Sequence, residues 1–124
     1  MRGLLDANIC ILLLIGETPA LTARVAECDA GDLAMSTVAF AEVALGSRGG
    51  KAPPLNVLEA FVEQIPLVPF DDAAARAYSK LPFRRGSFDR LIAAHAISLG
   101  LPLVTANEKD FADIEGLRVE NWTR

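Results

Sequence analysis

Three acidic side chains stand at positions that their apolar neighbours leave unexplained. Asp6 ends a short apolar run, Glu42 lies within the apolar stretch 38–45, and Asp89 stands near the start of another apolar segment. Each has an ordinary explanation as well: a helix N-cap, a thin exposed stripe, or a favourable charge at a helix start. Carboxylates held close together raise each other's pKa, and a divalent cation removes the conflict. The pattern therefore indicates a candidate metal site.

Oxygen is the ligand that the chain can best offer such a cation. Cys10 and Cys28 show no metal-ligand spacing, and His95 is the only histidine. Hard oxygen ligands favour Mg²⁺ or Mn²⁺, which can activate water and stabilise charge on a phosphate. A single histidine also excludes hydrolysis by a pair of histidines. Six positions of helix turn His95 away from Asp89, so we interpret it as a core or interface residue.

Asn107 is a candidate fourth member of the site. It follows the apolar run 101–104, within Thr105-Ala-Asn107. An asparagine with only a turn-forming role fits this position equally well. The hydroxyl of Thr105 could orient a carboxylate or a water molecule. Asp110 precedes an aromatic residue, and we interpret it as a solvated helix cap.

Strands and helices are expected to alternate along the chain. Apolar runs bounded by turn residues predict strands at 3–5, 33–35, 66–70, 101–104 and 117–119. Helical spacing, with capping residues such as Ser36, Asp71 and Ser87, predicts helices at 7–15, 19–28, 37–45, 55–64, 73–81 and 88–99. This order predicts an α/β fold with a mainly parallel sheet covered on both faces. The carboxyl ends of parallel strands share one edge, where the three acids can converge.

The composition fits one domain, residues 1–124, with one core. Hydrophobic residues make up 52% of the 124 positions and charged residues 23%. The run 9–15 is too short to span a bilayer, which needs roughly 20 residues. With no convincing secretory signal and no disulfide pattern, we expect a soluble cytoplasmic protein with two buried thiols, and no membrane association.

The net charge of −4 counts against a nucleic-acid binder at first sight. It does not decide the matter, because a metal-using nuclease must keep carboxylates in its site. Lys80, Arg84, Arg85 and Arg90 fall within eleven positions and form a candidate basic cluster. A solvated loop explains that cluster equally well.

The motifs also resemble those of a known family. Leu4-Leu-Asp-Ala-Asn-Ile9 is similar to the opening of PIN domains, and Ser36-Thr-Val-Ala-Phe-Ala-Glu-Val-Ala-Leu-Gly46 to their second motif. Segments 88–96 and 103–107 resemble the third and fourth, and 117–122 also fits. The resemblance covers nearly the whole chain and is nearest to VapC-type toxins of bacterial toxin–antitoxin pairs.

The resemblance implies a PIN-like three-layer sandwich, with about four or five strands flanked by helices, and an Mg²⁺- or Mn²⁺-dependent endoribonuclease. Its substrate would be RNA, often tRNA or rRNA, its inhibitor a small antitoxin protein, and its assembly a homodimer. By position, Asp6, Glu42 and Asp89 take the roles of the family's conserved acids, with Asp6 and Asp89 as metal ligands. Asn107 stands where many relatives have Asp, and Ala7 where Thr or Ser is common, so a second metal position is in doubt.

Three other functions compete with this interpretation. Aspartyl-phosphate phosphatases need a second Asp two residues after the first, but position 8 is Asn. A receiver-type regulatory domain needs an acidic pair and a Lys after a late strand, and Lys109 lies in the wrong context. A catalytically inactive PIN-like domain that binds RNA or regulates remains the alternative, although all three carboxylates are present.

Overall fold

The computed structural model describes residues 1–84 and 87–124. Its central feature is a parallel sheet in which five strands follow the order β3-β2-β1-β4-β5. The strands are β1 (Gly3–Leu5), β2 (Leu33–Ser36), β3 (Leu67–Val68), β4 (Leu103–Val104) and β5 (Val119–Glu120). The predicted mainly parallel sheet is therefore confirmed.

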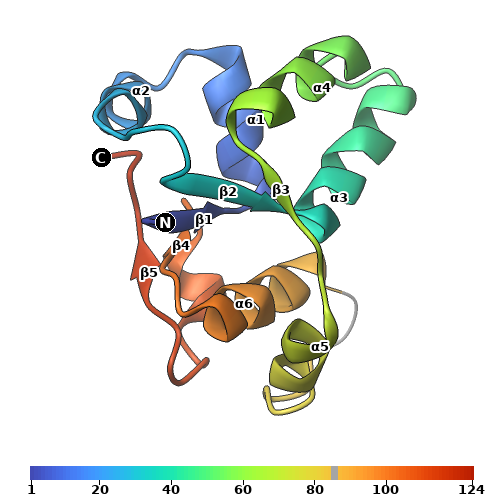
Figure 1. The fold of residues 1–124 in the computed structure, drawn as a ribbon, viewed down its shortest axis with the longest axis vertical. Coiled ribbons are helices and arrows are strands. Elements are labelled where there is room, and N and C mark those ends of the chain that lie inside the picture. The colour runs from blue at the N-terminus through green and yellow to red at the C-terminus, as the bar shows by residue number, and fades with distance from the viewer. Residues whose placement is uncertain (85–86) are drawn as a thin grey trace.

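Helices cover both faces of this sheet. They are α1 (Ala7–Ile15), α2 (Pro19–Ala26), α3 (Thr37–Arg48), α4 (Leu55–Gln64), α5 (Asp72–Tyr78) and α6 (Phe88–Leu99), with the short 3₁₀ helix η1 (Glu108–Phe111). Figure 1 shows α1, α2 and α4 on one side of the sheet and α5 and α6 on the other. The three-layer α/β sandwich is thus confirmed.

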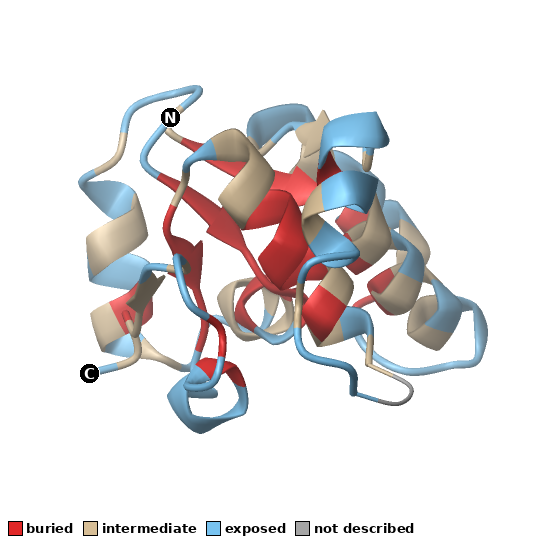
Figure 2. Ribbon diagram, turned by 90° about the horizontal axis from the view of Figure 1, so that it is seen from below, coloured by how far each residue is buried: buried red, intermediate tan, exposed pale blue. Residues whose placement is uncertain are grey.

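The core lies along the central strands, which are buried from both sides (Figure 2). Leu4, Leu5, Met35, Leu103 and Val104 are all fully buried. A strand buried on both faces needs apolar side chains pointing both ways, which is why these strands appear in the sequence as short continuous apolar runs.

Several predicted boundaries shift in the structure. Helix α3 continues to Arg48 rather than residue 45, because the Ser47 hydroxyl donates to the carbonyl oxygens of Val43 (3.1 Å) and Pro53 (2.6 Å) and supports another turn. Helix α5 ends at Tyr78 rather than residue 81, where the chain changes to tighter turns of the 3₁₀ type. Helix η1 was not predicted, and β5 lies at 119–120 rather than 117–119.

Two sequence expectations concern the chain's environment. Among the residues that the structure describes, no single helix is long and apolar enough to cross a membrane. Helices α1 and α2 reach that length and composition only together, and they are bent by 98°. Both cysteines are free thiols, but only Cys10 is buried; Cys28 is half-buried, so the prediction of two buried thiols is half wrong.

Candidate active site

Two polar residues follow neighbouring strands, β1 and β4, at the carboxyl edge of the sheet. Leu5 pairs with Met35 on one side and with Val104 on the other. The next residue along β1 and along β4, Asp6 and Thr105, is buried in each case. The chain leaves β1 toward β2 on one side and later adds β4 on the other, and ligands bind at such a switch in strand order.

Asp6 is both a helix cap and a member of this site. Its Oδ1 accepts a hydrogen bond from the backbone N–H of Ile9 at 2.8 Å, which caps α1. Burial raises the pKa of Asp6, hydrogen bonds from the Thr105 side chain and the Ile9 amide lower it, and the charge of Asp89 raises it further. The cap interpretation is therefore correct but incomplete, because the same carboxyl group lies in the field of a second acid.

Glu42 reaches the same region from α3. The hydroxyl of Ser36 begins this helix by accepting the Val38 amide at 3.1 Å, as predicted. The Oε1 atom of Glu42 is buried and has no hydrogen-bond partner within the described residues. Burial raises the pKa of Glu42, and the charges of Asp89 and Asp6 raise it further. A residue on an exposed stripe would keep both oxygens in water, so that alternative is wrong for Oε1.

Asp89 lies in the first turn of α6 and is half-buried. Burial raises its pKa, and the charge of Asp110 raises it further. The predicted side-chain cap from Ser87 is absent among the described hydrogen bonds. Asp110 is exposed, as a solvated cap would be, yet it acts on Asp89. Sequence reasoning missed this neighbour; the available signal was its position three residues after Asn107, close behind a strand end.

Asn107 is connected to the site through its backbone. Its N–H donates to the Thr105 hydroxyl at 3.0 Å, and the Thr105 side chain in turn lowers the pKa of Asp6. The Asn107 side chain is exposed, and no hydrogen bond of its amide group is found within the described residues. The structure thus brings Asp6, Glu42 and Asp89 into one electrostatic cluster and leaves the Asn107 side chain at its edge.

The acidic cluster meets some, but not all, of the requirements of a divalent-cation site. Within residues 1–84 and 87–124, no three His, Cys, Asp or Glu side chains lie close enough to hold an ion as they stand. Three observations nevertheless fit a cation: the donors are all oxygen, burial and nearby carboxylates raise the pKa values of Asp6, Glu42 and Asp89, and one Glu42 oxygen is buried without a partner among the described residues. An unpaired buried carboxylate is costly unless a positive charge compensates it.

The fold and these motifs have counterparts in known proteins. The PIN domain family model matches residues 3–117. The chain belongs to the PIN-domain family. It is 33% identical to the "tRNA(fMet)-specific endonuclease VapC" of Shigella flexneri, with 99% of each chain covered. The crystal structure of DNA-bound VapBC from Salmonella typhimurium matches with a TM-score of 0.86 at 27% identity, covering 98% of both chains. VapBC2 from Rickettsia felis, bound to a promoter fragment, matches with a TM-score of 0.84 at 26% identity, covering 98% of this chain and 99% of that one.

His95 belongs to the core of this PIN domain. It is fully buried, its Nδ1 lies 2.9 Å from the Ser36 hydroxyl oxygen, and its ring packs edge-on against Phe70. Burial lowers its pKa, which favours the neutral ring. The prediction that His95 is a core residue is confirmed. Trp122 is buried as well.

The predicted basic cluster is only partly available to a ligand. Arg90 is 3% exposed and forms an ion pair with Asp113 at 2.9 Å, so its inclusion in the candidate basic cluster was wrong. Lys80 and Arg84 are exposed and remain candidates for phosphate contacts. Arg85 lies outside the described residues.

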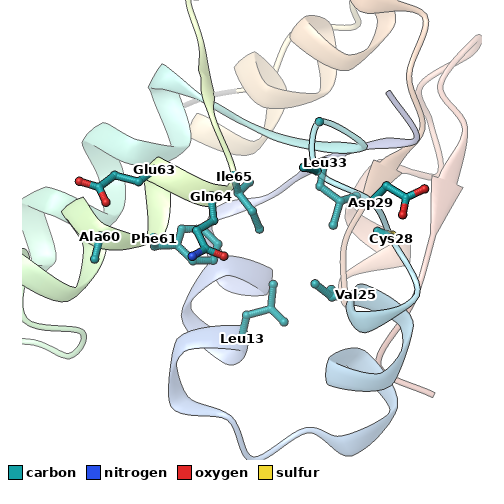
Figure 3. Close-up of a pocket in the computed structure, with 12 residues that line it drawn as sticks. Leu13, Val25, Cys28, Asp29, Leu33, Ala60, Phe61, Glu63, Gln64 and Ile65 are labelled. Atoms are coloured by element: carbon teal, nitrogen blue, oxygen red, sulfur yellow. The ribbon is translucent and has the colours of Figure 1, made fainter.

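A separate groove lies at the other end of the sheet. It has a volume of about 780 Å³ and is lined by residues of α1, α2, α4 and the turn before β2, including Leu13, Val25, Leu33, Phe61 and Ile65 (Figure 3). None of the three site acids lines it. This groove, which apolar side chains line together with Asp29, Glu63 and Gln64, is therefore distinct from the carboxylate cluster.

Proposed function

We propose that this PIN domain is a metal-dependent endoribonuclease and the toxin of a toxin–antitoxin pair. The observation that carries the proposal is the buried, unpartnered Oε1 of Glu42 in the joint field of Asp6 and Asp89. Such an arrangement is costly in the empty protein and becomes favourable when a cation is bound. The endonuclease name of the Shigella flexneri relative, which spans the whole chain, supports the reaction class.

Asp6 and Asp89 are the proposed ligands of Mg²⁺ or Mn²⁺, because Asp6 caps α1 at the end of β1 and Asp89, in the first turn of α6, acts on the pKa of Asp6. The bound cation supplies a Lewis acid to the scissile phosphate and promotes ionisation of the attacking water. Glu42 has a free carboxylate oxygen that can complete the ligand set or accept the proton of that water. Thr105 holds Asp6 in place, and Asn107 in turn supports Thr105 through its backbone N–H.

The proposed substrate is RNA, held by its phosphates. The Shigella flexneri relative is named for action on tRNA(fMet), so tRNA is the first substrate to test, followed by rRNA. The exposed cations Arg84 and Lys80 are the proposed phosphate contacts, since an acidic protein must bind a polyanion through local positive charge.

The proposed partner is a small antitoxin. The neighbours from Salmonella typhimurium and Rickettsia felis are described as VapBC assemblies. In this chain the apolar groove of Leu13, Val25, Phe61 and their neighbours offers an apolar segment of the partner a surface away from the acids. We also propose a homodimer, because Leu45 and Phe83 are 71% and 88% exposed and would be covered by a second copy.

The central experiment combines metal binding with RNA cleavage. Purified protein is titrated with Mn²⁺ by calorimetry and assayed on tRNA, with Asp89→Asn and, as control, Asp72→Asn. Both variants remove an acid from the first turn of a helix, but only Asp89 belongs to the cluster. We expect Asp89→Asn alone to lose Mn²⁺ binding and cleavage. Equal Mn²⁺ binding by both variants would refute the site. RNA binding without cleavage by the wild type at saturating Mn²⁺ would favour the inactive alternative.

A further inference from the structure

Arg90 directly follows Asp89, and its buried guanidinium makes several hydrogen bonds. Its Nη1 and Nη2 donate to the two carboxylate oxygens of Asp113 at 2.9 and 3.0 Å. This fork-to-fork geometry is specific to arginine, because lysine presents a single ammonium. Arg90 is 3% exposed, whereas the Asp113 side chain is 38% exposed. The ion pair therefore joins a buried guanidinium to a carboxylate that is partly exposed at the surface.

The same guanidinium contacts two further segments. Nη2 donates to the carbonyl oxygen of Pro82 at 3.1 Å, and Nη1 makes a longer contact of 3.5 Å with that of Asp110. One side chain thereby joins the start of α6, the segment before Arg84, and the segment from η1 to Asp113. Pro82 is eight residues from Arg90, whereas Asp110 and Asp113 are 20 and 23 residues away, and the hydrogen bonds of Arg90 hold these segments side by side.

The hydrogen bonds of Arg90 lie next to two acids, Asp89 of the candidate site and its neighbour Asp110. Asp89 directly precedes Arg90, and Asp110 is the residue whose own carbonyl contacts the guanidinium. The charge of Asp110 acts on Asp89, so the two carboxyl groups are neighbours. Their relative position consequently depends on the contacts that Arg90 makes with Asp110 and Asp113.

We propose that Arg90 is a positioning residue, whose ion pair with Asp113 sets the placement of Asp110 beside Asp89 and thereby the affinity of the acidic site for a divalent cation. The inference rests on the proposed function, because it assumes a cation at Asp89. Both Nη groups of Arg90 are taken up by Asp113 and two backbone carbonyls, and its buried Nε has no hydrogen-bond partner within the described residues, so Arg90 is not placed among the groups that bind RNA or cation. It acts by holding the segment of η1 against the first turn of α6.

A merely structural ion pair predicts a different outcome. Loss of such a pair lowers the melting temperature, but the protein that remains folded keeps its cation affinity. Loss of a positioning contact lowers the affinity of the folded protein, and excess cation restores function. Replacement of residues that orient metal ligands typically costs roughly 10–100-fold in affinity. Cation affinity measured well below the melting temperature separates the two roles.

The test uses Arg90→Lys and Asp113→Asn, with Leu58→Ala as control. Arg90→Lys keeps the charge and loses the fork, whereas Asp113→Asn removes the partner's charge at a partly exposed position. Leu58 is fully buried in α4, so its truncation destabilises the fold without changing the contacts of Arg90 with Pro82, Asp110 and Asp113, which we call the Arg90 clamp. Each protein is titrated with Mn²⁺ alone by calorimetry, and amide hydrogen exchange of residues 108–113 is followed in the metal-free state.

We expect Mn²⁺ affinity to fall by about 10-fold in both clamp variants. Amide hydrogen exchange at residues 108–113 should be faster. At saturating Mn²⁺, tRNA cleavage should return to within about twofold of wild type, because excess cation restores a lost affinity but not a lost chemical step. Leu58→Ala should keep wild-type affinity. If Arg90→Lys does not fold, Asp113→Asn decides. Wild-type Mn²⁺ affinity in the folded clamp variants overturns the inference. If wild type and Asp89→Asn bind Mn²⁺ equally, the proposed function itself has failed, and the inference fails with it.

Discussion

Two regions of this PIN domain differ in their chemistry. The groove of Leu13, Val25 and Phe61 is spacious and lined mainly by apolar residues, and it lies toward the amino end of β2. The carboxyl edge of the sheet instead gathers Asp6, Glu42 and Asp89, whose pKa values are all raised by burial. Volume alone would select the groove as the functional site. The cost of burying charge selects the carboxyl edge.

The difference indicates a division of labour. An apolar surface gains free energy from any apolar partner that covers it, so it suits a protein ligand. A cluster of repelling carboxylates gains free energy only from a positive charge, so it suits a cation and the phosphate that follows it. Perturbing one region should therefore leave the function of the other intact, and four experiments test this separation.

The largest effect is expected from the acids themselves. Asp6→Asn and Asp89→Asn should each lower single-turnover tRNA cleavage by at least roughly 10³-fold, because several kcal/mol of charge stabilisation depend on the cation. Glu42→Gln should cost about 10²-fold. Asn107→Ala should cost least, roughly 10-fold at most, because its contact with Thr105 uses the backbone N–H, which alanine keeps.

The controls for this series come from helix capping and from surface charge. Asparagine caps helices about as well as aspartate, so Asp6→Asn should keep the cap to the Ile9 amide and the native circular dichroism spectrum. Glu59→Gln, an exposed change on α4, should cleave at the wild-type rate. Wild-type cleavage by Asp6→Asn and Asp89→Asn would mean that the carboxylate mechanism is wrong.

The second effect is confined to the groove. Phe61→Asp places a charge in its apolar lining, and it should weaken antitoxin binding by about 100-fold, on the scale of an interface hot spot. Cleavage by the free toxin should not change. Val57→Asp, on the same helix but outside the lining, is the matched control. The measurement is titration with the proposed antitoxin, and loss of cleavage in Phe61→Asp would break the proposed separation.

A third, smaller effect concerns RNA binding. Arg84→Ala should weaken binding of catalytically inactive Asp89→Asn protein to tRNA a few-fold. It should also reduce the slope of log K against log salt by about 0.7–0.9, as expected for one lost phosphate contact. Arg118→Ala is the control, because that exposed arginine precedes β5 and donates to the Gly100 carbonyl oxygen at the amino edge of the sheet. An unchanged slope for Arg84→Ala would place the phosphate contacts elsewhere.

The smallest effect is a pH dependence of stability in the metal-free protein. The native pKa values of Asp6, Glu42 and Asp89 lie above their unfolded values, so their stabilising contribution is complete below the unfolded pKa, about 4. It is lost as pH rises through the raised native pKa values. Asp6→Asn should therefore raise the neutral-pH melting temperature by about 4 °C, equivalent to about 1 kcal/mol.

Asp113 provides a control of opposite sign for this experiment. Its hydrogen bond with Arg90 lowers its pKa, so its contribution is present above the unfolded pKa and lost as pH falls. Asp113→Asn should lower the melting temperature at neutral pH, whereas Asp6→Asn raises it. Added Mn²⁺ should stabilise the wild type and not Asp6→Asn. Identical melting curves for wild type and Asp6→Asn from pH 4 to 8 would contradict the repulsion among the acids.

Much of the architecture could be predicted from short patterns. Ser36 and Asp71 cap their helices through side-chain hydrogen bonds to the Val38 and Ala74 amides, as their residue types indicate. Gly100 ends α6 in the left-handed region at φ 68°, where glycine bears no Cβ penalty. Local patterns failed at two places. Ser87 has the residue type of a cap but makes no capping hydrogen bond through its side chain within the described part of the chain, and η1 has no apolar periodicity that would have predicted it.

The sequence by itself determined the parallel α/β arrangement, because apolar runs and caps are local properties that tertiary packing seldom reverses. It also identified Asp6, Glu42 and Asp89 as acids whose apolar surroundings demanded an explanation. Only the tertiary structure decided that Arg90 is buried against Asp113 and that Asp110 acts on Asp89. Charge and burial at those positions depend on segments twenty or more residues away, and no spacing rule within one helix can report which distant carboxylate a given arginine meets.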